Sequence, residues 1–334
     1  MKRPALSVLL ALTLAGLVMA PAGTPKPVQR FRVGIVTEPA GVNVPIYRLM
    51  RDGLARAVRT LGVEGRVLTP SPKEGYLPSF STLARQHYDL VIATAGSQGP
   101  DLARAAQRFP KTRFAWLDNP VENLPGRPGN VAGVVFAEQE VGYLVGYLAA
   151  LMEKRRPGKD VISSVGGFKQ YPPIQRFIAG YESGARGADP GITTLRAFTY
   201  DFLDRAKCRK AALAQIAEGS GVVFNVAGDC GFGALEAAKE KGVWGIGVDV
   251  DQSSLGPFIL TSAVKRFDVA VFRVIAAAKE GSLDTGRTRV LRLRDVALGL
   301  GKISPKVPRS FVLWLERIRS RIVAGKIRIP TQIS

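Results

Sequence analysis

The stretch GVWGIGVDVDQ, residues 242–252, has the residue types for a chemical role, because an apolar run ends there in polar side chains. Asp249 and Asp251 follow the run, with Gln252 beside them. One aspartate can accept hydrogen bonds from two adjacent hydroxyl groups, so a carboxylate at this place suits a sugar. The stretch therefore indicates a site for a hydroxyl-bearing ligand.

Five other apolar runs end in polar or flexible residues, at 36–38, 95–98, 117–119, 165–167 and 227–229. Any one of them could be the solvated start of a loop. In open parallel sheets, however, ligands bind beyond the carboxyl ends of the strands. Six such ends at equivalent places predict the rim of a cleft between two lobes.

The residues needed for several common chemistries are missing. His87 is the single histidine, and a lone His before a strand is more often structural, which argues against a His-based triad or a histidine zinc site. GDCGFG, residues 228–233, lacks the glycine spacing of a dinucleotide site and suits close approach of backbone to a ligand. No nucleophile has a plausible base. We expect a binding protein without catalytic residues, metal or cofactor.

The elements that must position these residues alternate between apolar runs and segments of helical period. The expected strands are 31–36, 63–70, 88–96, 112–118, 130–136, 161–167, 192–200, 221–228 and 243–250. The expected helices are 50–61, 101–109, 140–152, 174–186, 206–218 and 234–241. A break at 155–160 separates two rounds of alternation. The pattern predicts an α/β protein with two doubly wound parallel-sheet lobes.

The first 22 residues have a basic start, an apolar run of about 15 residues and a small-residue cleavage site, as in a secretory signal peptide. A single membrane anchor is the alternative, but the run is shorter than the roughly 20 residues that span a bilayer. No cysteine lies near the site. We therefore expect an exported, extracytoplasmic protein that is not lipid-anchored through cysteine.

The formal net charge is +20, which attracts polyanions such as nucleic acid, anionic lipid or acidic polymers in general. A solvated basic surface is the simpler explanation, because the basic residues are spread along the chain. They are locally dense at 154–156 and in the C-terminal third. The charge alone therefore predicts no nucleic-acid partner.

Ordered motifs over residues 31–330 resemble the basic membrane protein family, the substrate-binding proteins of ABC importers that include purine-nucleoside receptors. The matching motifs are FAWLD (114–118), GYLVGYLAALMEK (142–154), PPIQRFIAGYESG (172–184), residues 201–242, GIGVDVDQS (245–253), LTSAVKRFDVAVF (260–272) and IVAGKIRIP (322–330). The resemblance implies a type I periplasmic-binding-protein fold with three hinge crossings. The expected lobes are 31–156 with about 260–282, and 157–259 with about 283–330.

The resemblance also implies a set of ligand-binding residues. They are Asp249 at the ribose, Asp118 in the opposite lobe, Lys265 near a crossing, Gly228 for backbone contact, and Phe168 and Phe224 as aromatic walls. Two of these have alternatives. Phe224 lies inside an apolar strand and could simply pack, and Lys265 could be a hinge ion-pair partner.

One departure concerns the first lobe. Nucleoside-binding members carry Asp-x-Ser-Phe-Asn ahead of the first helix, whereas residues 37–54 read TEPAGVNVPIYRLMRDGL. Asn43 and Tyr47 can stand in for the Asn and the aromatic residue, but the Asp and Ser are gone. A different heterocycle or a ribose-like sugar stays open as the ligand, and the family also includes flavin-binding members.

The two cysteines, Cys208 and Cys230, form an even pair that an exported protein can bridge. The resemblance to a family branch with Cys at both places implies a disulfide. The bridge requires that the two following helices share one face of the sheet. It would stabilise the second lobe by roughly 3 kcal/mol.

The leading hypothesis is an exported, monomeric receptor that delivers a nucleoside-like small molecule to an ABC permease in the membrane. Closure of the lobes would convert binding into a shape that the permease recognises. A ligand-sensing regulatory protein without transport is the alternative. An exported nucleoside hydrolase would need clustered acids, and the acids here are scattered.

Overall fold

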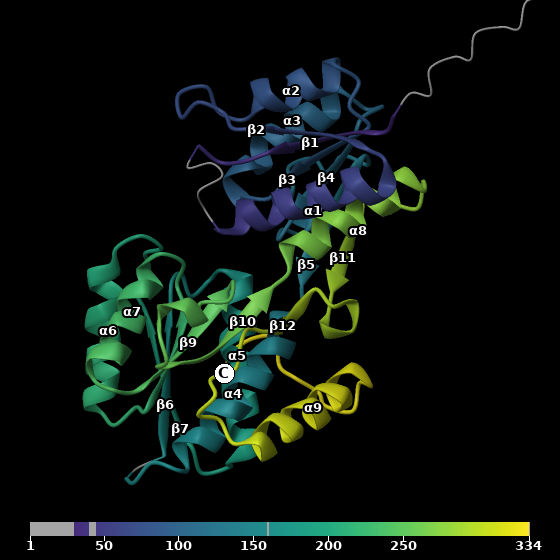
Figure 1. The fold of residues 1–334 in the computed structure, drawn as a ribbon. Coiled ribbons are helices and arrows are strands. Elements are labelled where there is room, and N and C mark those ends of the chain that lie inside the picture. Colours follow the sequence, from purple (N-terminus) through teal and green to yellow (C-terminus); the bar gives the residue numbers. More distant parts are fainter. Residues whose placement is uncertain (1–29, 40–44, 159, 334) are drawn as a thin grey trace, which may run out of the picture. The chain divides into compact units, whose positions relative to one another are not determined.

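Two six-stranded sheets organise the computed structural model, which describes residues 30–39, 45–158 and 160–333 (Figure 1). The first sheet has the order β11-β5-β4-β3-β1-β2 and all its pairings are parallel. The second has the order β12-β10-β9-β8-β6-β7, with only β12 antiparallel. The predicted signal peptide and Asn43 lie outside the described residues.

The central strands are buried along nearly their whole length, which explains why they read as continuous apolar runs. The first sheet consists of β1 (Arg32–Val36), β2 (Glu64–Leu68), β3 (Leu90–Ala93), β4 (Arg113–Leu117), β5 (Val131–Phe136) and β11 (Thr288–Leu291). The second consists of β6 (Val161–Gly166), β7 (Thr193–Phe198), β8 (Val222–Val226), β9 (Trp244–Asp249), β10 (Ile259–Lys265) and β12 (Leu298–Leu300). Every strand that the sequence predicted is present.

Helices cover both faces of each sheet (Figure 1). Around the first sheet these are α1 (Pro45–Leu61) with α8 (Phe267–Lys279), and α2 (Leu77–Arg85) with α3 (Gly99–Arg108). Around the second they are α4 (Glu138–Glu153), α5 (Pro172–Ala188) and α9 (Arg309–Val323), and opposite them α6 (Arg205–Ala217) and α7 (Cys230–Glu240). Helices α2, α8 and α9 were not among the predicted helices, and α7 begins at Cys230, four residues before the expected start.

The chain passes between the sheets three times, after β5, after β10 and after β11, as the fold class requires. The sheet membership of two strands differs from the predicted division of the chain. Strand β10 was expected in the first lobe but lies beside β9 in the second sheet. Strand β11 was expected in the second lobe but pairs with β5 in the first. Strand β11 has four residues, whereas β10 has seven and lies between β9 and β12, and the chain changes lobe directly after each of them.

Helix α4 was also expected in the first lobe but packs on α5 and α9. Glycines allow the close approach of α4 and α5. A Cβ added at Gly146 would lie 1.9 Å from the carbonyl oxygen of Tyr181, and one added at Gly184 would lie 2.0 Å from that of Tyr143. Larger side chains would force the two helices apart. This packing carries Glu138, at the start of α4, to the junction between the lobes.

Candidate functional site

A cavity of about 620 Å³ lies at the carboxyl ends of both sheets, within the size range of small-molecule sites. Five of the six strand ends singled out in the sequence contribute to its wall. They supply Glu38, residues 95–97, Asp118, Gly228 with Asp229, and Asp249 with Val250. The end of β6, residues 165–167, does not line the cavity. The expectation of a ligand-sized cleft at the sheet ends is therefore met by the structure.

Lys265 ends β10 and is almost fully buried, with its ammonium among acidic side chains. Its Nζ donates a hydrogen bond of 2.5 Å to Oδ1 of Asp118. Oε1 of Glu138 lies 3.1 Å away as an ion-pair partner without hydrogen-bond geometry. The other oxygen of Glu138 accepts from Arg176. The ammonium also lies 4.8 Å from the ring centroid of Phe136 and 5.3 Å from that of Phe267.

Three carboxylates thus surround one lysine, and this arrangement shifts the pKa values of Lys265, Asp118 and Asp249. Burial by itself would lower the pKa of Lys265, but Asp118, Glu138 and Asp249 together raise it above its ordinary value. Burial raises the pKa of Asp118 more than Lys265 lowers it, and Glu138 and Asp249 raise it further, to about 6. The Asp118 side chain is nonetheless 16% exposed, because it borders the cavity. Lys265 therefore stays charged, while the acids share an excess of negative charge.

Asp249 is the last residue of β9 and Asp118 directly follows β4, so the two aspartates lie at corresponding strand ends of the two sheets. Both have left-handed backbone, with φ of 63°, which is uncommon for residues other than glycine. The Asp249 carboxylate lines the cavity and accepts no hydrogen bond from any residue that the structure describes. Burial raises its pKa, Lys265 lowers it to a smaller extent, and Glu138 raises it. An acceptor without a protein partner is available to a ligand.

Lys265 combines the two roles that the sequence left open. It forms the ion pair near a crossing, and it also lines the cavity. Gly228 lines the cavity too and has φ of 58°, a left-handed conformation that favours glycine. A Cβ there would lie 3.3 Å from the carbonyl oxygen of Phe202. Backbone can therefore approach a ligand at this point, as the sequence indicated.

The two phenylalanines predicted as aromatic walls do not line the cavity. Phe224 is fully buried within β8 and packs on Phe177 and Tyr181, with ring centroids 6.1 Å and 5.0 Å away. Its alternative role in packing is the one observed. Phe168 contacts the rings of Tyr200 and Phe202, at 6.1 Å and 5.1 Å. It supports the cavity wall from behind Phe202.

Four other aromatic rings line the second-lobe wall, and the sequence analysis missed them: Tyr171, Phe177, Phe202 and Phe232. Phe232 lies within the GDCGFG stretch that was already singled out, and Phe202 follows shortly after β7. For Tyr171, Phe202 and Phe232 the available signal was closeness to a strand end, whereas Phe177 lies inside α5. Burial raises the pKa of Tyr171 above its usual range, so its hydroxyl stays protonated.

In the first lobe, the predicted Tyr47 is held beside a carboxylate that the sequence analysis did not propose as a ligand contact. The Tyr47 hydroxyl donates to Oε2 of Glu38 at 3.0 Å, and Oγ of Ser97 donates to Oε1 at 3.2 Å. All three residues line the cavity. Burial and the Glu38 charge raise the pKa of Tyr47. Glu38 thus places an acidic side chain in the first-lobe wall of the cavity.

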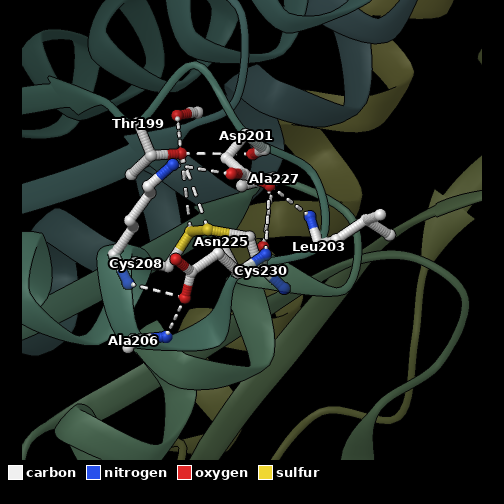
Figure 2. The surroundings of a disulfide bond; sticks show 11 residues. Thr199, Asp201, Leu203, Ala206, Cys208, Asn225, Ala227 and Cys230 are labelled. Carbon is white, nitrogen blue, oxygen red and sulfur yellow. Dashed lines mark hydrogen bonds and ion pairs between the residues drawn. A yellow bond between two sulfur atoms is a disulfide. The ribbon is translucent and has the colours of Figure 1, made fainter.

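The predicted disulfide between Cys208 and Cys230 is present, with Cα atoms 5.5 Å apart (Figure 2). It joins α6 to α7, which lie on one face of the second sheet as the prediction required. Figure 2 shows Thr199 beside the bridge, with its Oγ1 3.5 Å from the Cys230 sulfur. The backbone N–H of Cys230 donates to the carbonyl of Phe202 at 2.9 Å. The bridge therefore anchors the loop that carries Phe202 into the cavity wall.

The same loop is fixed by carboxylates. Oδ1 of Asp201 accepts from the backbone N–H groups of Leu203 and Asp204, and its Oδ2 accepts from Lys207 at 2.8 Å. These bonds lower the pKa of Asp201 below its usual range. Asp204 caps α6 by accepting from Ala206 N–H. The second-lobe wall is thus held by a covalent bridge and by charge-assisted hydrogen bonds.

Two parallel α/β lobes, three crossings and a ligand-sized cavity between the sheet ends define a type I periplasmic-binding fold. Residues 35–332 match the family model of the PnrA-like ABC transporter substrate-binding proteins. The chain belongs to this family. It is therefore a substrate-binding protein of the kind that serves ABC transporters, and the family is not a class of enzymes. Among the described residues, no helix has the length and apolar character needed to cross a membrane.

Curated relatives are similar over most of the chain. The CD4+ T-cell-stimulating antigen of Listeria monocytogenes is 28% identical, over 90% of this chain and 88% of its own length. The ABC transporter nucleoside-binding protein BmpA of Lactococcus lactis is 26% identical, over 90% and 89%. A Pyrococcus horikoshii protein named as an uncharacterized lipoprotein is 30% identical, over 70% and 60%. The word lipoprotein in that relative's name disagrees with the expectation that this chain is not lipid-anchored through cysteine.

Solved structures share the fold. A solute-binding protein of an ABC transporter system from Aeropyrum pernix superimposes with a TM-score of 0.73 at 24% identity, covering 91% of this chain and 94% of that one. A Bacillus halodurans protein described as a transcriptional activator of the comK gene gives 0.75 at 22% identity, covering 90% and 99%. At these identities the likeness concerns the fold alone.

Proposed function

We propose that this chain binds a nucleoside-like molecule, with purine nucleosides as the first candidates, in the cavity between the two sheets. The single observation that carries the proposal is the Asp249 carboxylate, which borders the cavity and accepts no hydrogen bond from any described residue. A carboxylate in this situation suits the two adjacent hydroxyls of a ribose. The name of the Lactococcus lactis relative points to the same ligand class.

The remaining walls fit the two other parts of a nucleoside. The rings of Tyr171, Phe202 and Phe232 offer faces for stacking on a heterocyclic base. Glu38, with its two oxygens already held by Tyr47 and Ser97, has lone pairs left for N–H donors on a base edge. We assign no ligand contact to Phe224, because it is buried in the core.

The charge of the cavity favours an uncharged ligand over a phosphorylated one. Glu38, Asp118, Asp229 and Asp249 line it, against Lys265 as the only Lys or Arg among the lining residues that are described. Lys265 is already engaged by Asp118 and Glu138. A phosphate group would meet net negative charge and lose its hydration without a cationic partner. Nucleotides should therefore bind more weakly than nucleosides.

In this proposal the protein is exported and extracytoplasmic, acts as a monomer, and hands its ligand to a membrane permease. Ligand contacts with both sheets would favour the closed arrangement of the lobes, which the permease would recognise. The three crossings between the sheets, after β5, β10 and β11, are the segments about which such a movement would occur.

Calorimetric titration with guanosine, inosine, adenosine, ribose and guanosine monophosphate tests the proposal. We expect at least one nucleoside to bind, with ribose and the monophosphate at least about tenfold weaker. Incubation with the bound nucleoside should give no free base, as expected for a receptor. Absence of binding by every nucleoside would contradict the ligand class, and release of free base would contradict a purely binding role.

A further inference from the structure

The C-terminal part of the chain carries an excess of positive charge for which ligand binding gives no explanation. Between residues 302 and 328 the sequence has eight Lys or Arg and one acid, Glu316. Helix α9 carries Arg309, Arg317, Arg319 and Arg321, and none of them forms a salt bridge with any residue that the structure describes. Elsewhere many arginines are paired, such as Arg176 with Glu138 and Arg266 with Asp268.

The exposed side of α9 combines this charge with large apolar side chains. Leu315, Ile318 and Ile322 are buried and define the inner face of the helix. On the outer side, Leu313 is 53% exposed and Trp314 is 42% exposed. Arg317 and Arg321 are exposed and follow Leu313 at intervals of four residues, so they share its face. The outer face is therefore both apolar and cationic.

A second basic segment reaches the same surface from a distant part of the sequence. The guanidinium of Arg155 lies 6.0 Å from the ring centroid of Phe311. The Phe311 ring stacks on that of Trp314, with centroids 5.5 Å apart and planes at 18°. Lys154 and Arg156 are paired with Asp189 and Glu153. Arg155 is exposed and has no acidic partner among the described residues.

We propose that the α9 surface, formed by Arg155, Phe311, Leu313, Trp314, Arg317 and Arg321, docks on the anionic phospholipid surface of a bilayer. Leucine and tryptophan at the headgroup level bury apolar area and keep the indole N–H in contact with polar groups. Arginines beside them attract anionic headgroups while their stems lie along the apolar layer. The combination of both features on one helix face suits a bilayer surface.

The position of the α9 surface favours lipid over the two other classes of partner. All six residues belong to elements around the second sheet, α4, α9 and their flanking residues. A permease that detects lobe closure must contact both lobes, so a surface on one lobe does not suit that task. A soluble polyanion would be attracted by the arginines but would gain nothing from exposed Leu313. None of the six residues lines the ligand cavity.

Co-sedimentation of the purified protein with vesicles tests the proposal. Vesicles of phosphatidylglycerol and phosphatidylcholine should bind the protein, and pure phosphatidylcholine vesicles should not. Replacing both exposed arginines, R317E with R321E, removes about 1 kcal/mol each of attraction to the anionic surface, so partitioning should fall at least about 30-fold. Arg51 and Arg59 on α1 are exposed and have no salt-bridge partner among the described residues. R51E with R59E therefore gives the same change of net charge elsewhere and should leave most binding intact.

The apolar part is tested with L313S combined with W314S, which should lower partitioning at least about tenfold without changing net charge. Circular dichroism confirms that each variant folds. Three outcomes would overturn the proposal: no binding to anionic vesicles, equal loss in the α1 and α9 arginine variants, or unchanged binding of the L313S/W314S variant. Trp314 fluorescence should shift to the blue when wild type binds anionic vesicles, and this shift should be smaller in the R317E/R321E variant, which keeps Trp314.

Discussion

The two sheets end in aspartates with the same backbone conformation but different surroundings. Asp118 directly follows β4 and Asp249 is the last residue of β9, and each has φ of 63°. Asp118 is bonded to Lys265 at 2.5 Å, whereas the Asp249 carboxylate accepts no hydrogen bond from the described residues. One lysine therefore distinguishes two otherwise equivalent places. Asp118 therefore stabilises the junction between the lobes, whereas Asp249 is available to a ligand.

The walls around these two aspartates are also held differently. In the first lobe, Glu38, Tyr47 and Ser97 are connected by side-chain hydrogen bonds. In the second lobe, the Cys208–Cys230 bridge and the Asp201 and Asp204 hydrogen bonds fix the loop of Phe202. The second lobe thus presents a covalently braced wall, and the first presents one that depends on single hydrogen bonds.

The largest expected effect comes from Lys265→Met, which removes the cation that distinguishes Asp118 from Asp249. Three acids would remain buried together without their lysine. Breaking a buried ion pair on one side costs about 3–5 kcal/mol of unfolding free energy. Urea unfolding measures this loss, with exposed Lys210→Met as the control. A loss below about 1 kcal/mol would show that the lysine does not support the junction.

The next effect concerns the disulfide bond in the second lobe. Replacing Cys208 and Cys230 by Ala should lower the unfolding free energy by about 3 kcal/mol, since the bridge closes a loop of 22 residues. Urea unfolding of the double variant and of wild type gives the difference. Thiol titration of denatured, unreduced wild type should find almost no free thiol. Two reactive thiols per chain would contradict the Cys208–Cys230 disulfide.

The third effect isolates the ligand-facing acid. Asp249→Ala and Asp249→Asn should weaken nucleoside binding at least about tenfold, or about 1.4 kcal/mol, because the ribose loses its acceptor. The fold should remain, because the carboxylate has no bonded partner among the described residues. Calorimetric titration gives the affinity and circular dichroism the fold. Unchanged nucleoside affinity in both variants would contradict the assignment of Asp249 as a ligand contact.

A smaller effect appears in the pH dependence of stability. The pKa values of Asp118 and Asp249 are raised, that of Asp118 to about 6. For an acid with a raised pKa, the stabilising contribution is present at low pH and is lost as pH rises through the folded-state pKa. Asp249→Asn should therefore gain melting temperature relative to wild type as pH rises above about 4, where the aspartate of the unfolded chain ionises. Exposed Asp52→Asn on α1 serves as the control. A difference in melting temperature between Asp249→Asn and wild type that does not change with pH would contradict the raised pKa of Asp249.

The smallest effect concerns the first-lobe wall. Tyr47→Phe removes the hydroxyl that donates to Glu38 but keeps the ring. The loss of one such hydrogen bond is worth about 1 kcal/mol, so ligand affinity should fall by about fivefold or less. Calorimetric titration with the same nucleoside measures this change in affinity. A loss of ligand affinity greater than that of Asp249→Ala would mean that the first-lobe wall contributes more to ligand binding than the second-lobe acid.

Sequence reasoning reached the strand ends because parallel strands of one sheet bring their carboxyl ends to one edge. It located Asp118, Gly228 and Asp249 at the cavity, and the family resemblance added Lys265. It could not separate Phe224 from a wall residue, because a strand buried on both faces gives no alternation to read. Its division of the chain also differed from the sheet membership at β10 and β11, which are strands after which the chain changes lobe.

Sequence reasoning gave no role in the site to Glu138, and it placed residues 36–38 at the rim of the cleft without proposing Glu38 as a contact. Glu138 begins α4 and lies 3.1 Å from the ammonium of Lys265, which ends β10 far along the chain. Glu38 precedes α1 and gains its place in the wall through Tyr47 and Ser97. Neither arrangement follows from local periodicity, since each depends on contacts between elements far apart in the chain.

The most direct measurement is mass spectrometry of small molecules released from wild type and from Asp249→Asn after parallel native purification. A nucleoside, with its pair of adjacent hydroxyls, should accompany wild type and be at least about tenfold depleted in the variant. Equal amounts of the molecule in both proteins, or a molecule without such hydroxyls, would contradict the assignment of Asp249 as the ligand-binding acid.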